Sequence, residues 1–161
     1  MRKAEFISQQ KLNTISSLAK ESPRRRKNYN FHSSDDDMCH RLLNAMEPDS
    51  YIQPHRHLDS NKDETLIVLR GKMGLVIFSD HGDIEEKSFL EPNGDVLVAN
   101  IPSGKYHTWV SLAPNSVFFE AKGGPYRPLT TDEKAKWAPD EGEPSSQTYL
   151  ADIKKMFEPF L

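Results

Sequence analysis

"ETLIVLRGKMGLVIFSD" (residues 64–80) contains two short apolar runs that meet at Gly71, where the glycine marks a turn. Runs of this kind are typical of buried strands. Similar runs recur on both sides, at residues 41–46, 50–57, 85–90, 95–101, 107–112 and 116–121. Turn signals rich in Gly, Pro and Asn separate them. Many short strands at regular spacing predict a mainly β protein, built as a sandwich or a barrel.

Other local signals surround these strands. "PNGD" (residues 92–95) is a strong hairpin signal, so it predicts a hairpin between its flanking runs. Apolar residues at helical spacing predict an amphipathic helix over residues 6–20, which Pro23 ends. The C-terminal part predicts a short helix near Thr131 to Trp137 and a second from about Ser146 to Phe157.

Composition restricts the function classes. The chain has 161 residues, 36% hydrophobic and 28% charged, which suits one globular domain. A net charge of -3 argues against a nucleic-acid or membrane partner, although "RRRK" (residues 24–27) is locally basic. No apolar stretch suits a signal peptide or a membrane span, so a cytoplasmic location is expected. Cys39, the single cysteine, is expected to be a core or half-buried thiol.

The segment before residue 64 carries two histidines, His55 and His57. In an extended chain residues i and i+2 point to the same side, so both imidazoles would project together. Neutral imidazoles are good ligands for transition metals, and Glu64 could add a carboxylate. Alone, the pair is equally compatible with a solvated loop beside Pro54.

"PSGKYH" (residues 102–107) adds a third imidazole. A Pro-x-Gly turn precedes His107, which opens another strand run. His107 and Trp109 lie on one face of that strand, so His107 would project into the same interior as the first pair. Three histidines and a carboxylate then favour a metal site over a solvated loop.

These stretches resemble the two motifs of the cupin superfamily, G-x5-H-x-H-x3or4-E-x6-G and G-x5-P-x-G-x2-H-x3-N. The resemblance implies that His55, His57, Glu64 and His107 are metal ligands. Six residues separate His57 from Glu64, more than the pattern has, and Ser111 replaces its asparagine. The register therefore decides whether the Glu64 carboxylate points inward, and Asp59 and Asp63 are the local substitutes.

Further segments resemble the WbuC family of cupin-fold metalloproteins: "SPRRRKNYNFH", "RLLNAMEPDSYIQPHRH" and "GGPYRPL". The resemblance implies a single cupin jelly-roll β-barrel with an N-terminal helix and C-terminal helices. Its parts would be residues 1–39 packing on the barrel, the barrel at 40–124 and an extension at 125–161, in one domain overall. Compared with members of this family, the chain has two extra residues, Ser60 and Asn61, in the loop before Glu64. An insertion in a surface loop is tolerated, so Glu64 would still be a ligand.

The implied cofactor is one divalent transition metal ion, and ligand type alone does not choose among Zn, Fe, Mn and Ni. Candidate substrate-binding residues are Arg26, Asn28 and His32, in a segment that the resemblance folds over the barrel mouth, together with Arg41, Tyr106 and Tyr126. Tyr126 could instead be a packing residue, and Arg41 could make a structural ion pair.

Three functions fit this reading. The first is a metal-binding WbuC-type protein that acts on or binds a small molecule in bacterial surface-polysaccharide or sugar metabolism. The second is a non-catalytic small-ligand-binding or regulatory cupin, and the third a metal-free nucleotide-sugar isomerase or epimerase. Four converging ligands argue against the third. The apolar residues on both faces of "TLIVL" suggest a cover over one barrel face, either terminal helices or a second subunit in a homodimer.

Overall fold

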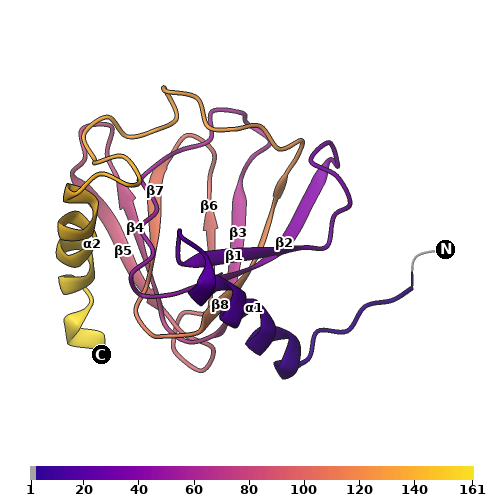
Figure 1. Cartoon of the computed structure of the whole chain (residues 1–161). Helices are drawn as coiled ribbons and strands as arrows, with labels where there is room; N and C mark the ends of the chain where they lie inside the picture. The colour runs from indigo at the N-terminus through magenta and orange to yellow at the C-terminus, as the bar shows by residue number, and fades with distance from the viewer. Residues whose placement is uncertain (1–2) are drawn as a thin grey trace.

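The computed structural model describes residues 3–161, so residues 1 and 2 of the expected N-terminal part lie outside the described residues. The elements, in chain order, are α1 (Gln9–Glu21), β1 (Arg26–Asn30), β2 (Cys39–Met46), β3 (Glu64–Arg70), β4 (Met73–Phe78), β5 (Ile84–Leu90), β6 (Val98–Ile101), β7 (Tyr106–Ser111), β8 (Ser116–Gly123), α2 (Ser145–Lys155) and a 3-10 turn, Glu158–Phe160. The prediction of a mainly β protein is confirmed (Figure 1).

The strands form two antiparallel sheets that pack face to face. One has five strands in the order β1-β2-β8-β3-β6, and the other has three in the order β5-β4-β7. Among residues 3–161 no strand ladder joins the two sheets into a closed barrel. The apolar core between them takes side chains from both: Met46, Leu66, Val68, Met73, Leu75, Leu90, Ile101, Trp109 and Phe118.

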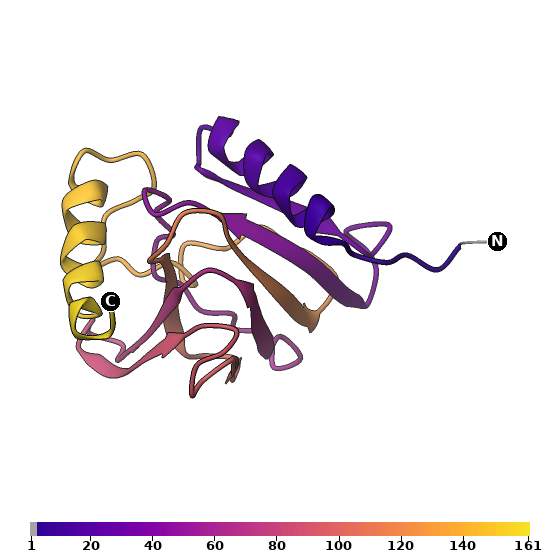
Figure 2. The ribbon, with the colours of Figure 1, turned by 90° about the horizontal axis from the view of Figure 1, so that it is seen from below.

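The two helices cover the outer faces of the sheets (Figure 2). Leu12, Ile15 and Ala19 of α1 pack on the five-stranded sheet, and Leu150 and Ile153 of α2 pack on the three-stranded one. Full burial of one such aliphatic side chain stabilises the fold by about 1.5–3 kcal/mol. The protein therefore has three apolar layers, one between the sheets and one under each helix.

Two local predictions were wrong. Thr131 to Trp137 forms turns and no α-helix, because its backbone bonds to the histidine segment: the Ala135 N–H donates to the Pro54 carbonyl at 2.9 Å. "PNGD" forms a turn but no hairpin, since β5 and β6 belong to different sheets. A turn signal specifies the local bend and not which partners the flanking strands find.

The segment before β2 and the start of β2 form one edge of the five-stranded sheet. Arg26–Asn30 is a strand, β1, that pairs with β2 at the edge of the sheet, with Asn28 opposite Asn44. Cys39, at the start of β2, is exposed, so its prediction as a core or half-buried thiol was wrong. No helix in residues 3–161 has the length and apolar character that crossing a membrane requires.

Candidate metal centre and its cavity

Backbone pairing brings the three predicted histidines together. The segment of His55 and His57 forms an isolated bridge with β7, in which the His55 N–H donates to the His107 carbonyl at 3.0 Å and the His107 N–H returns a bond of 2.8 Å. The ring centroid of His55 lies 5.3 Å from that of His57 and 4.7 Å from that of His107. Three imidazoles from two distant stretches therefore share one side of the interior.

Glu64 completes this cluster. It is the first residue of β3 and is 4% exposed. Its Oε1 lies 2.8 Å from Nε2 of His57, and its Oε2 lies 3.2 Å from Nε2 of His107. Asp59 and Asp63 are both exposed, and Asp63 accepts a hydrogen bond from the Ser103 N–H. Of the three carboxylates considered, the structure brings Glu64 to the histidines.

The longer loop does not disturb the start of β3, because it folds against the end of β8. Asn61 Nδ2 donates to the Gly124 carbonyl at 3.2 Å. The backbone comes so close to Gly123 that a Cβ there would lie 2.0 Å from the Asn61 carbonyl oxygen. Glycine at position 123 thus makes room for the loop that contains Ser60 and Asn61.

The two buried imidazoles of the bridge are oriented by backbone carbonyls. Nδ1 of His55 donates to the Gln53 carbonyl at 3.0 Å, and Nδ1 of His107 donates to the Lys105 carbonyl at 2.9 Å. A carbonyl only accepts, so in each neutral ring Nε2 carries the lone pair. Burial lowers the pKa of His55 to about 3, with the neighbouring His107 as the next cause. His55 is therefore neutral near pH 7, the form in which an imidazole binds metal.

This orientation leaves two acceptors facing each other. With Nδ1 of His107 donating to Lys105, the Nε2 lone pair of the neutral ring points at Oε2 of Glu64 across 3.2 Å. Two lone pairs at this distance repel unless a proton or a cation lies between them. The donor chemistry of the cluster therefore suits a bound cation.

A lysine that the sequence analysis missed also reaches the cluster. Lys122 Nζ lies 2.9 Å from Oε1 of Glu64 and 2.8 Å from Oε1 of Glu120. Burial alone lowers the pKa of Lys122, but the charges of Glu120 and Glu64 outweigh burial and raise it. Burial likewise raises the pKa of Glu64, yet Lys122 and the His107 and His57 contacts hold that pKa well below its usual value. Both groups are charged at neutral pH.

The residues fit a transition metal in type, and two of their contacts fit it in length. A metal held at about 2.1 Å by imidazole nitrogen and carboxylate oxygen needs neighbouring ligand atoms about 3 Å apart. The two contacts of Glu64 with the imidazoles, 2.8 and 3.2 Å, meet that requirement. In residues 3–161, however, no group of three or more His, Cys, Asp or Glu side chains is already arranged as a metal site. The carboxylate of Glu64 instead contacts its two imidazoles and Lys122 directly.

The cluster forms one end of a cavity of about 340 Å³ on the inner face of the five-stranded sheet. Its polar lining comes mainly from β1, β2 and β8 and its apolar floor from between the sheets. The lining residues are Arg24, Arg26, Asn28, Asn30, His32, Asp35, His40, Leu42, Asn44, Met46, Ile52, His55, Glu64, Trp109, Phe118, Glu120, Lys122 and Tyr126.

Four of the six candidate substrate-binding residues line this cavity: Arg26, Asn28, His32 and Tyr126. The guanidinium of Arg26 is already engaged, since it donates to both carboxylate oxygens of Glu141 at 2.6 and 2.8 Å and to the Tyr51 carbonyl at 2.8 Å. Tyr126 is 48% exposed at the rim.

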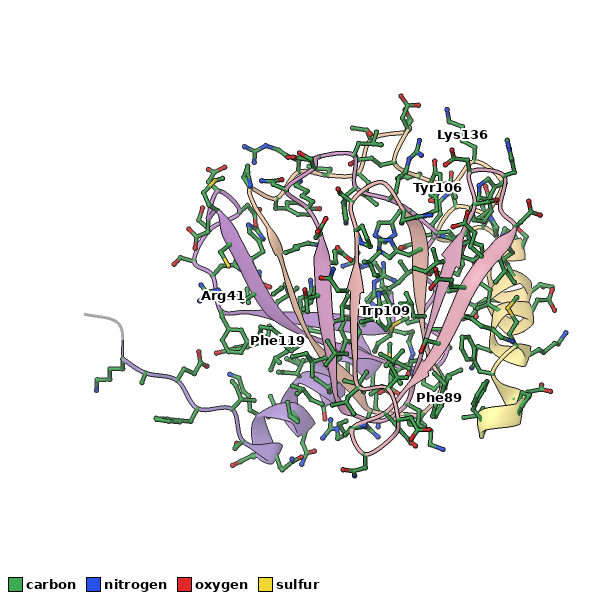
Figure 3. All side chains as sticks on the ribbon, turned by 180° about the vertical axis from the view of Figure 1, so that it is seen from behind. Arg41, Phe89, Tyr106, Trp109, Phe119 and Lys136 are labelled. Carbon is green, nitrogen blue, oxygen red and sulfur yellow. The ribbon has the colours of Figure 1, made fainter. Side chains whose placement is uncertain are left out.

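The structure does not bring Arg41 and Tyr106 to the cavity. Arg41 is exposed and follows the inward His40 in β2, so alternation turns it to the outer face, where Phe119 also lies (Figure 3). Tyr106 precedes His107 and points the opposite way for the same reason. Its hydroxyl donates to the Asp132 carbonyl at 3.3 Å, and its ring belongs to the core under α2.

Four polar residues that line the cavity were not predicted from the sequence: His40, Asn44, Glu120 and Lys122. Asn44 Nδ2 donates to Oε2 of Glu120 at 2.7 Å, so a polar row runs from β2 through β8 to Glu64. One signal could have revealed part of it. In "SVFFEAKG", Phe118, Glu120 and Lys122 share one strand face, and a buried apolar position followed by two charged ones is unusual for a core.

Solved structures with a similar fold are cupin-fold proteins. CapF, solved with the inhibitor 3-isopropenyl-tropolone, is 23% identical with a TM-score of 0.52, over 69% of this chain and 31% of CapF. KdgF from Halomonas sp. is 21% identical with a TM-score of 0.50, over 66% of this chain and 84% of KdgF. SO0799 from Shewanella oneidensis is 11% identical with a TM-score of 0.52, over 63% of this chain and 68% of SO0799.

At these identities the likeness shows the fold, and the fold is that of cupins. A search among curated proteins gives no match. Residues 7–90 match the model of a family described as "Domain of unknown function (DUF6016)". The matched part contains His55, His57 and Glu64, whereas His107 and Lys122 follow it. Because the match covers more than half of the chain, this protein belongs to the DUF6016 family.

Proposed function

We propose that this protein binds one divalent transition metal ion through His55, His57, Glu64 and His107 and holds a small anionic molecule beside it. The observation that carries the proposal is the 3.2 Å contact between Nε2 of His107 and Oε2 of Glu64, two atoms that are both acceptors when the imidazole is neutral. The Lys105 carbonyl holds Nδ1 of the same ring, so the ring cannot relieve this contact by changing its tautomer. A metal ion between the two atoms satisfies both, as does a proton on Nε2, and metal content distinguishes these two arrangements.

The metal would be Zn, Fe, Mn or Ni, and when bound it would supply Lewis acidity toward a carbonyl or hydroxy-acid group, or oxygen chemistry if it is iron. The chain's own residues orient the site. The Gln53 and Lys105 carbonyls hold the Nδ1 atoms of His55 and His107, which aims each Nε2 at the interior. The side chains of Trp109 and Phe118 form an apolar wall of the site.

The charge of the cavity favours an anion once a metal is present. Three cationic side chains line it (Arg24, Arg26 and Lys122) and three anionic ones (Asp35, Glu64 and Glu120). These charges balance, so a divalent ion gives the cavity an excess of positive charge. A carboxylate or another oxyanion is the complementary ligand.

The wider assignment rests on the sequence resemblance. From that resemblance we propose membership of the WbuC family and a role in bacterial surface-polysaccharide or sugar metabolism. The cytoplasmic location is proposed from the sequence features described above. A homodimer is also proposed, and two side chains of the five-stranded sheet support it: Leu69 on β3 and Val98 on β6 are 39% and 45% exposed.

Lys122 supports a second candidate function. Its ammonium group already lies 2.9 Å from Glu64 and supplies positive charge at the position that a metal would serve. A metal-free protein of the isomerase or epimerase kind, in which the histidines exchange protons with a ligand, is consistent with that contact. Metal content distinguishes the two candidates.

Elemental analysis of protein purified without added metal tests the proposal. We expect close to one transition metal per chain in the natural protein and in a His81→Ala control, because His81 lies exposed in the turn between β4 and β5. His107→Ala should lose the metal while the circular dichroism spectrum is unchanged. Absence of metal from the natural protein, even after incubation with each of the four ions, would favour the metal-free candidate.

A further inference from the structure

Beyond the histidine cluster, the cavity contains two buried polar atoms with unused hydrogen-bonding capacity: Nε1 of Trp109 makes no hydrogen bond within residues 3–161, and Oε1 of Glu120 has the ammonium of Lys122 beside it and a further lone pair. Trp109 is 3% exposed and Glu120 8% exposed. One atom is a donor and the other an acceptor, and the cavity they line contains the proposed metal ligands His55 and Glu64. Buried polar atoms are nearly always paired, so such atoms in a cavity wall indicate a ligand.

The indole of Trp109 is held in place by its packing. Its ring stacks on Phe118, with centroids 5.7 Å apart and planes at 20°. Trp109 lies two residues after His107 on the same face of β7, inside the layer between the sheets (Figure 3). Because this packing fixes the ring, the N–H needs an acceptor that comes to it.

The carboxylate of Glu120 has its charge balanced but not its hydrogen bonding. Oε2 accepts from Asn44 Nδ2 at 2.7 Å. Lys122 Nζ lies 2.8 Å from Oε1 as an ion pair, which leaves this oxygen a second lone pair for another donor. With a cation already beside it, Glu120 suits a neutral donor better than a second cation.

We propose that Trp109 and Glu120 form a hydroxyl-recognition subsite, so that the ligand of this cavity is a polyhydroxylated carboxylate. A hydroxyl group both accepts and donates, which is what an indole N–H and a carboxylate oxygen together require. This inference rests on the proposed function, since the ligand's carboxylate would lie at the metal and its hydroxyls at the subsite. Asn28 and Asn44, opposite each other on β1 and β2, extend the polar surface for further hydroxyls.

Other ligand classes fit less well. An aliphatic acid would leave the Trp109 N–H unpaired inside the protein and the free lone pair of Glu120 Oε1 unused, and an unpaired buried donor strongly disfavours binding. An amine would meet the ammonium group of Lys122 beside Glu120. Neither objection applies to hydroxyl groups.

The test compares D-gluconate with hexanoate, two six-carbon carboxylates that differ in hydroxyls, by titration calorimetry on the metal-loaded protein. We expect gluconate to bind the natural protein at least about tenfold more tightly. Trp109→Phe keeps an aromatic ring against Phe118 but removes the N–H, so the preference should fall toward one. Trp137→Phe is the matched control, because Trp137 Nε1 is also buried without a hydrogen bond but lies outside this cavity.

Glu120→Gln gives a second variant in case Trp109→Phe fails to fold, and it should lower the same preference. Equal binding of the two acids by the natural protein, or an unchanged preference in Trp109→Phe or Glu120→Gln, overturns the subsite. Failure of both acids to bind the metal-loaded protein also overturns it. Metal content, measured on the same samples, judges the proposed function separately: a metal-free protein that still prefers gluconate supports the subsite while contradicting the metal proposal.

Discussion

The interior between the two sheets is polar at one end and apolar at the other, although the same strands line both ends. β3 begins with Glu64 at the histidine cluster and continues with Leu66 and Val68 in the core. β8 runs the opposite way, from Phe118 in the core to Glu120 and Lys122 at the cluster. A strand keeps its inner face by alternation, so position along the strand, and not the choice of face, separates site from core.

The two ends of this interior are stabilised by different interactions. At the apolar end, side chains from both sheets fill the space and burial stabilises them. The five-stranded sheet is wider than its three-stranded partner, and the cavity lies over the inner face of β1, β2 and β8. At that polar end charged groups must compensate one another. The two ends should therefore respond differently to substitution.

Lys122→Met should give the largest effect, at the polar end. It leaves the carboxylates of Glu64 and Glu120 without their shared cation, which typically costs about 3–5 kcal/mol of unfolding free energy. Denaturation in urea with a chelator present measures this loss. With excess Zn²⁺ the loss should shrink, because a metal on Glu64 replaces part of the missing charge. The same loss in both conditions would count against a metal at Glu64.

Leu66→Ala should act at the apolar end. Leu66 is 1% exposed between the sheets, and truncating such a side chain costs about 2–5 kcal/mol. The measurement is again urea denaturation, now expected to give the same loss with and without Zn²⁺. A change in metal content of the folded variant would show that the two ends are coupled and not separate.

Glu64→Gln should weaken metal binding by about tenfold, less than His55→Ala or His107→Ala, because the amide oxygen keeps a weaker ligand in place. A competition titration with a metal indicator measures the dissociation constants. Asp63→Asn is the control, since Asp63 is exposed and accepts from the Ser103 N–H outside the cluster. If Asp63→Asn had the larger effect, the ligand assignment would pass from Glu64 to Asp63.

Ser8→Ala should have the smallest effect and none on the site. The Ser8 hydroxyl accepts from the Lys11 N–H at the start of α1, and loss of such a cap costs about 1 kcal/mol. Thermal unfolding should shift accordingly while metal content remains that of the natural protein. Loss of metal in this variant would mean that α1, on the outer face of the sheet, controls the cavity.

The sequence predicts the residues of the cluster better than their surroundings. The spacing of His55, His57 and His107 and the apolar runs around them are local patterns, so the convergence of these residues could be anticipated. The position of Tyr106 could also have been excluded, because it neighbours His107 on the same strand. Arg41 could not have been excluded in this way, since the sequence around it does not reveal which face of β2 points inward.

The surroundings of the cluster depend on strand pairings between distant segments of the chain. Lys122 reaches Glu64 because β8 pairs with β3 in a register that sets the two residues opposite each other. The chain crosses from β5 in one sheet to β6 in the other, so the turn at residues 92–95 forms without the hairpin that it predicts. No local pattern specifies either pairing, so the polar row of Asn44, Glu120 and Lys122 emerges only in the folded protein.

Anomalous X-ray diffraction at the absorption edges of Mn, Fe, Ni and Zn, on crystals of protein purified without chelator, tests the proposed metal site. We expect one anomalous peak per chain, bounded by the side chains of His55, His57, Glu64 and His107. A map without a peak there, with Lys122 still bonded to Glu64 and Glu64 to the imidazoles, would contradict it.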